Sequence, residues 1–79
     1  MMATLSQLAL NDEGFAFDPS NGDSYTLNRT GLLIIRALQE GKTVPQIVRM
    51  LVDKFQLTPV EASRDVADFQ LRLRTVGLA

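Results

Sequence analysis

The chain contains no cysteine, no histidine and no tryptophan. The lack of cysteine excludes disulfides and thiolate metal sites, and it is consistent with a reducing cytosol. Without histidine or cysteine there is no Ser-His-Asp or Cys-His nucleophile system, and no His or Cys ligand for a metal. The sequence therefore predicts a protein that is not an enzyme and has no cofactor. Its fold must be stabilised by packing, or by packing together with a partner or a second copy in a homodimer.

The chain also lacks a strong charge of one sign. Eight basic and nine acidic residues give a formal net charge of −1, and the two kinds are interleaved. Nucleic-acid binding draws on basic patches that neutralise phosphates, so no nucleic-acid partner is expected. No apolar run is long enough to span a bilayer, and the N-terminus has no signal-peptide pattern. We therefore expect no membrane partner and a soluble, cytoplasmic protein.

What is present fits one small domain. Seventy-nine residues, of which 46% are apolar, supply one core but not two. Residues 1–79 are therefore expected to form a single domain. The pattern changes once, near residue 28, from short strand signals to helical periodicity.

Three short strands are expected in the first part of the chain. Leu5–Leu10 gives a modest strand signal, and Phe15–Phe17 is a short strand with both aromatic rings on one face. The segment 18–23 is dense in turn residues and lacks the ligand spacing of a calcium loop. Tyr25–Leu27 then returns as the third strand, so the three segments form an antiparallel meander.

Three helices are expected in the second part. The first runs from an Asn28 cap to about Gln39 and is apolar nearly all round, which is typical of a helix packed between two layers. Thr43 and Thr58 each begin a Thr-x-x-Gln or Thr-x-x-Glu capping box, which predicts two further helix starts. The last helix carries one apolar stripe: Ala62, Val66, Phe69, Leu73 and Val76. The fold class is α+β and winged-helix-like, with a three-stranded antiparallel sheet followed by a three-helix bundle.

A set of short motifs follows in a fixed order along nearly the whole chain. They are the segment Gly14–Gly31 with its Asp-Pro turn and its Leu-Asn-x-x-Gly end, Thr43-Val44-x-x-Ile47, Asp65-Val66-x-x-Phe69 and Leu73-x-x-x-Gly77-Leu78. In order and spacing this set resembles the PqqD-like family. Gln70 departs from the pattern, since a leucine is common there.

The resemblance implies a winged-helix-like domain that binds peptides, often called a RiPP recognition element. Such bacterial domains capture the leader of a ribosomally made precursor peptide and present it to a modifying enzyme, commonly a radical SAM protein. The founding member serves pyrroloquinoline quinone biosynthesis. The implied function is thus a stand-alone peptide-binding adaptor, or peptide chaperone, whose partners are the precursor peptide and the modifying enzyme.

The resemblance also implies where the peptide binds. In such domains the leader adds a strand beside the third β-strand, in the groove next to the third helix. An unpaired strand edge offers backbone N–H and C=O groups to an extended chain, which is consistent with that mode. For Phe69, core packing and groove lining both remain open. The residues expected to bind the peptide are Ser24, Tyr25, Thr26 and Leu27 of the strand, and Asp65, Phe69 and Arg72 of the helix.

Two alternative functions belong to other classes. A winged-helix DNA-binding protein would need a basic recognition helix, yet the third helix mixes acidic and basic residues. A non-catalytic structural subunit would have the third strand's edge covered by another chain. DNA binding would appear in a shift assay, and a stable dimer would appear in light scattering.

Overall fold

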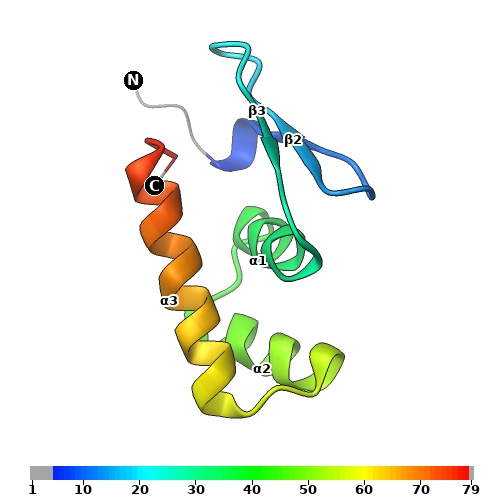
Figure 1. The fold of residues 1–79 in the computed structure, drawn as a ribbon, viewed down its shortest axis with the longest axis vertical. Coiled ribbons are helices and arrows are strands. Elements are labelled where there is room, and N and C mark those ends of the chain that lie inside the picture. The colour runs from blue at the N-terminus through cyan, green and yellow to red at the C-terminus, as the bar shows by residue number, and fades with distance from the viewer. Residues whose placement is uncertain (1–4, 79) are drawn as a thin grey trace.

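The computed structural model describes residues 5–78 of the chain. The strands form one antiparallel sheet in the order β1-β2-β3, and the helices follow (Figure 1). The predicted α+β architecture, a three-stranded sheet followed by three helices, is confirmed. The elements in chain order are a 3₁₀ helix η1 (Leu5–Gln7), β1 (Ala9–Leu10), β2 (Phe15–Phe17), β3 (Ser24–Thr26), α1 (Arg29–Gln39), α2 (Val44–Phe55) and α3 (Pro59–Thr75).

The prediction of a strand over Leu5–Leu10 is wrong for its first half. The backbone N–H of Leu8 donates to the carbonyl of Leu5 at 3.2 Å, closing a turn of 3₁₀ helix. The side-chain amide of Gln39 donates to the carbonyls of Leu5 and Leu8 at 2.7 and 3.1 Å. Contacts with α1 therefore satisfy two carbonyls of this segment, and only Ala9–Leu10 pairs with β2.

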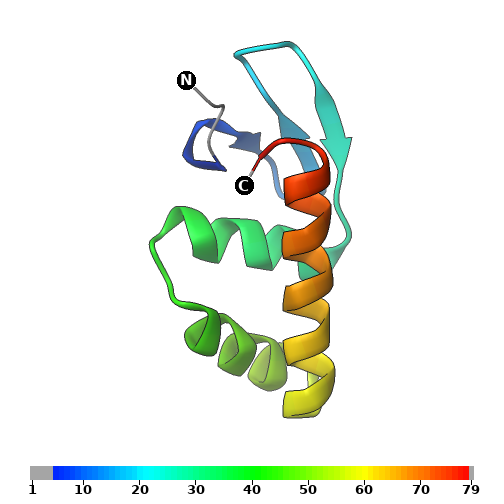
Figure 2. The same ribbon diagram turned by 90° about the vertical axis from the view of Figure 1, so that its left-hand side faces the viewer.

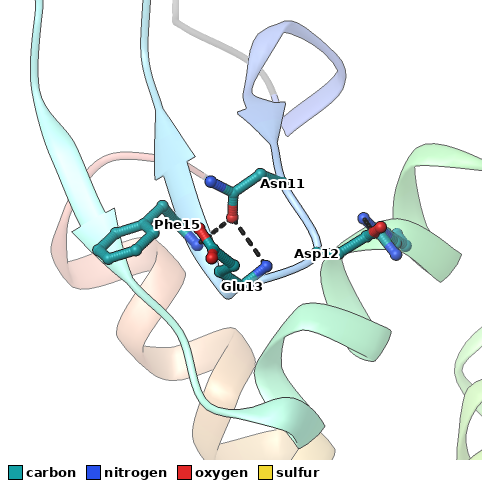
Figure 3. Close-up of polar contacts among 5 residues, drawn as sticks. Asn11, Asp12, Glu13 and Phe15 are labelled. Atoms are coloured by element: carbon teal, nitrogen blue, oxygen red, sulfur yellow. Dashed lines mark hydrogen bonds and ion pairs between the residues drawn. The ribbon is translucent and has the colours of Figure 1, made fainter.

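The turn between β1 and β2 is closed by one asparagine side chain. The Oδ1 atom of Asn11 accepts hydrogen bonds from the N–H groups of Glu13 and Phe15, both at 3.0 Å (Figure 3). Asp12 in the same turn forms an ion pair with Arg36 of α1 at 2.7 Å. The turn is thus tied to the first helix as well as to the sheet.

The turn between β2 and β3 is organised by Asp18, as turn chemistry predicts for this segment. Its Oδ1 accepts from the N–H and Oγ of Ser20 at 2.9 and 2.6 Å. Asn21 stabilises the second half of the turn, because its Oδ1 accepts a hydrogen bond from the N–H of Asp23 at 2.9 Å. Asp18 is buried, so this side chain also belongs to the inner face of the sheet.

All three predicted helix caps are present. Asn28 accepts from the N–H of Gly31 at 2.7 Å, and Thr43 and Thr58 both head reciprocal capping boxes. In the second box the N–H of Thr58 donates to the Glu61 carboxylate at 2.9 Å. This hydrogen bond, together with that from the Thr58 side chain, lowers the pKa of Glu61 below its ordinary value. No helix within residues 5–78 has the length and apolar content needed to cross a membrane.

The core consists of two clusters with α1 between them. Ile34 of α1 belongs to the cluster against α2, and Ile35 belongs to the cluster against the sheet. The prediction that the first helix packs between two layers is confirmed. Figure 2 shows α3 standing alongside both layers, and accordingly Val66 lies in the first cluster and Leu73 in the second.

The last predicted member of the α3 stripe lies outside this core. Val76 is 49% exposed, because it is the C-cap of the helix rather than part of its last full turn. Beyond it the N–H of Leu78 donates to the carbonyl of Leu73 at 2.8 Å, and the N–H of Gly77 donates to that of Arg74 at 3.1 Å. These two bonds form a Schellman motif. The motif turns Leu78 back into the core, where it is 5% exposed.

Candidate functional site

The outer edge of β3 is open among residues 5–78. β2 lies between the other two strands, so β3 has a sheet partner on one side only. Its register places Thr26 opposite Phe15, Tyr25 opposite Ala16 and Ser24 opposite Phe17. The third strand was expected over Tyr25–Leu27, whereas β3 spans Ser24–Thr26, so the expectation is displaced by one residue along the chain.

The hydrogen-bond pattern shows which backbone groups of β3 face this edge. The N–H of Leu27 donates to the carbonyl of Gly14 at 2.6 Å, and that of Asp18 donates to Asp23 at 2.8 Å. Hydrogen-bonded pairs alternate along an antiparallel ladder. The backbone groups of Tyr25, halfway between these pairs, therefore point toward β2. Those of Ser24 and Thr26 point away from the sheet.

An apolar groove lies between β3 and α3. We call it the β3–α3 groove; its volume is about 190 Å³. Its surface is largely apolar because its floor belongs to the second core cluster. The residues that line it are Leu8, Ala16, Tyr25, Thr26, Leu27, Ile35, Phe69, Arg72, Leu73, Val76 and Leu78.

A second, more polar hollow adjoins the groove. It has a volume of about 150 Å³ and shares Phe69 and Arg72 with the β3–α3 groove. Its other walls come from the start of α1 and from Asp65 and Asp68 of α3. Phe69 and Arg72 therefore separate an apolar compartment from one that carries two carboxylates.

Phe69 is seated against the start of α1 by the absence of a side chain at Gly31. A Cβ atom placed on Gly31 would lie 2.8 Å from Cε1 of the Phe69 ring. Phe69 is half-buried and packs against both core clusters. It also lines both hollows. The sequence left open whether Phe69 packs in the core or lines the groove. In the structure the same ring does both.

The only tyrosine of the chain lies at the wall of the groove. Partial burial raises the pKa of the Tyr25 phenol, and the negative charges of Asp23 and Asp18 raise it further. The hydroxyl therefore stays neutral at pH 7 and can donate a hydrogen bond. Among residues 5–78 no ion pair is formed by Asp65 or Arg72, so both charges remain available to a ligand. No cluster of three or more carboxylates suited to a metal occurs in that part of the chain.

The structure brings most of the predicted site residues together. Tyr25, Thr26, Leu27, Phe69 and Arg72 all line the β3–α3 groove. Two others lie at its border: Asp65 lines the adjoining hollow, and Ser24 is exposed on β3 outside the groove lining.

Sequence reasoning missed most of the groove floor. Leu8, Ala16, Ile35 and Leu78 come from four separate segments, and no local pattern joins them. A signal for one of them was present. Gly77 followed by an apolar residue predicts a Schellman motif in which Leu78 contacts Leu73.

Comparison with known proteins is consistent with this geometry. Residues 13–79 match the model of the family described as coenzyme PQQ synthesis protein D (PqqD). A solved structure of lasso peptide synthetase B1 complexed with the leader peptide is similar, with a TM-score of 0.75 and 27% sequence identity. The match covers 89% of this chain and 84% of that one. A comparison with curated proteins gave no match. The family match spans most of the chain, and on that basis the chain belongs to the PqqD family.

Proposed function

We propose that this chain is a peptide-binding adaptor that captures the leader of a ribosomally made precursor peptide and presents it to a modifying enzyme. The observation that carries the proposal is the open edge of β3 beside the β3–α3 groove. Family membership and the leader-bound structural neighbour support it. Residues 1–79 act together as one binding domain in the cytoplasm, where precursors are made.

The leader binds by adding a fourth strand beside β3. Its backbone pairs with the outward N–H and C=O groups of Ser24 and Thr26. A leader residue opposite Tyr25 then forms a pair without backbone hydrogen bonds, in which side chains are closest. That side chain lies on the face of Tyr25 and enters the β3–α3 groove. The apolar lining of the groove suits an apolar leader residue at this position.

Charges at the border of the groove set the direction of the bound chain. Arg72 lines both compartments, and Asp65 lines only the polar one. An acidic leader residue is therefore favoured toward Arg72 and a basic one toward Asp65. Such exposed pairs contribute about 0–1 kcal/mol each, so they select orientation more than they supply affinity.

The adaptor role assigns the chemistry to the enzyme, for which a radical SAM protein is the family-based candidate. Binding raises the effective concentration of the precursor at the enzyme. Ordering a flexible leader costs about 2–5 kcal/mol, which limits the affinity of this step.

An NMR titration tests the proposal. Labelled protein is titrated with synthetic leader peptides copied from short precursors encoded beside its gene, and with a scrambled leader as control. We expect shifts concentrated at residues 24–27 and 65–72. Shifts elsewhere would contradict the site, and the absence of binding by every such leader would contradict the adaptor. Light scattering of the same sample reports whether the protein is a dimer, as the structural-subunit alternative with a covered β3 edge requires.

A further inference from the structure

A second groove lies between α1 and α2, away from the β3–α3 groove. We call it the α1–α2 groove; its volume is about 320 Å³. Its apolar surface comes from four half-buried side chains: Leu32, Leu33, Met50 and Phe55. It shares no lining residue with the β3–α3 groove. A leader bound beside β3 therefore leaves it free.

The rim of the α1–α2 groove carries two cations for which residues 5–78 supply no ion-pair partner. Arg29 and Lys54 are exposed and form no ion pair within residues 5–78. Arg36 on the same rim is already paired with Asp12 at 2.7 Å. Figure 3 shows Asp12 extending from the β1–β2 turn toward α1. The ion pair links the β1–β2 turn to α1 at the rim. Arg29 and Lys54 are left to pair with the charges of a ligand.

The positive charge extends onto the neighbouring surface. A shallow hollow that shares Met50 with the groove is lined by Lys42, Arg49 and Asp53. The two hollows together hold five of the chain's eight basic residues and three acidic ones. The local net charge is thus +2 on a chain whose net charge is −1.

We propose that the α1–α2 groove binds an acidic segment of a partner protein, anchored by a bulky apolar side chain. The apolar floor takes the anchor, and Arg29 and Lys54 pair with carboxylates on either side of it. That this partner is the enzyme receiving the leader rests on the proposed function. The chemistry of the surface does not depend on it.

Two other occupants fit the surface less well. Nucleic acid requires a denser run of cations than a local excess of +2, and among the apolar side chains of this groove only Phe55 offers an aromatic ring for base stacking. A second copy could offer the outer side of α3, where Val60 and Leu71 are 66% and 59% exposed. The charges beside them, however, are those of Arg64 and Arg74, which do not complement a basic rim. That contact would join two different surfaces, so it would build a ring or an open chain unless two copies form both contacts reciprocally about a two-fold axis.

The test uses a double charge reversal, Arg29→Glu with Lys54→Glu, on the full chain. Both residues are exposed, so the fold is expected to remain intact, as circular dichroism will show. The matched control is Arg64→Glu with Arg74→Glu, two exposed positions on α3 that line neither groove. The probe is a synthetic peptide of about 12 residues, roughly the length of α1 and α2. It has leucine and phenylalanine on one helical face and glutamate elsewhere.

We expect the glutamate peptide to shift the amides of Leu32, Leu33, Lys54 and Phe55. The rim reversal should weaken its binding by at least about tenfold, whereas the α3 reversal should leave it within about twofold. No shift, shifts at other residues, or equal binding by a lysine-for-glutamate peptide or a DNA duplex would overturn the inference. Leader binding is measured in parallel. If the original protein binds the glutamate peptide but no leader peptide, the proposed function is overturned and the inference about the α1–α2 groove stands.

Discussion

Replacing Thr26 with proline is expected to weaken leader binding by at least about tenfold while the domain stays folded. The N–H of Thr26 points away from β2, so no hydrogen bond of the sheet is lost. Proline removes the donor that would face the added strand and places its ring in the strand's path. A bound leader would keep an unpaired buried carbonyl, which costs about 1–3 kcal/mol. Isothermal titration calorimetry with the leader peptide measures the loss.

Thr26→Val is the matched control for this substitution. It keeps the backbone N–H and the β-branched shape, so leader affinity should stay within about threefold of the original protein. Circular dichroism and thermal unfolding show whether the proline variant is folded. A folded Thr26→Pro variant that binds the leader with unchanged affinity would contradict pairing at the β3 edge.

Gly14→Ala is expected to produce the largest loss of stability among single methyl additions at the glycines. Gly14 is buried and has φ +94°, a conformation that L side chains rarely adopt. A Cβ atom there would overlap the carbonyl oxygen of Leu27, which is backbone and cannot rotate away. We expect a loss of about 2–4 kcal/mol in the free energy of unfolding. Such a loss is a large part of the stability of so small a domain.

Gly22→Ala separates the two causes. Gly22 has a similar φ of +80°, but a Cβ atom there meets nothing within 4 Å. Its cost should be the conformational one alone, about 1–2 kcal/mol. Urea unfolding, monitored by circular dichroism, measures the free energy of unfolding of the original protein and of the Gly14→Ala and Gly22→Ala variants. Equal losses for the two alanine variants would show that the contact with Leu27 contributes nothing.

The helices could be predicted from the sequence because their signals are local. The Thr-x-x-Gln and Thr-x-x-Glu boxes each lie within four residues and place the N-caps of α2 and α3 at Thr43 and Thr58, one residue before each helix begins. The packing of α1 between two layers could be predicted because the helix is apolar nearly all round. Such signals are independent of the rest of the fold, and the structure confirms them.

The start of the chain could not be predicted in the same way. η1 depends on hydrogen bonds from Gln39, which lies more than 30 residues away in the sequence. Likewise, the aromatic pair of Phe15 and Phe17 was placed on one face, but the sequence did not say which face meets the helices. Both rings are on the outer face, 52% and 45% exposed, and Ala16 packs inward.

The candidate site was predictable along its strand and helix, but not in its floor. The family resemblance pointed to β3 and α3, and five of the seven residues named from it line the β3–α3 groove. Leu8 and Leu78 come from opposite ends of the chain and meet only when η1, the sheet and α3 are assembled. The outward direction of the Ser24 and Thr26 backbone groups could not be predicted either, because it depends on how β3 pairs with β2.

The central claim is that the leader binds by pairing with the open edge of β3, and amide hydrogen exchange tests it most directly. Exchange is measured for each residue with and without saturating leader peptide. We predict that the amides of Ser24 and Thr26 become at least about tenfold slower to exchange, because they gain partners from the added strand. The amide of Tyr25, which already faces β2, should change less. A bound leader that leaves Ser24 and Thr26 exchanging as fast as before would contradict the claim.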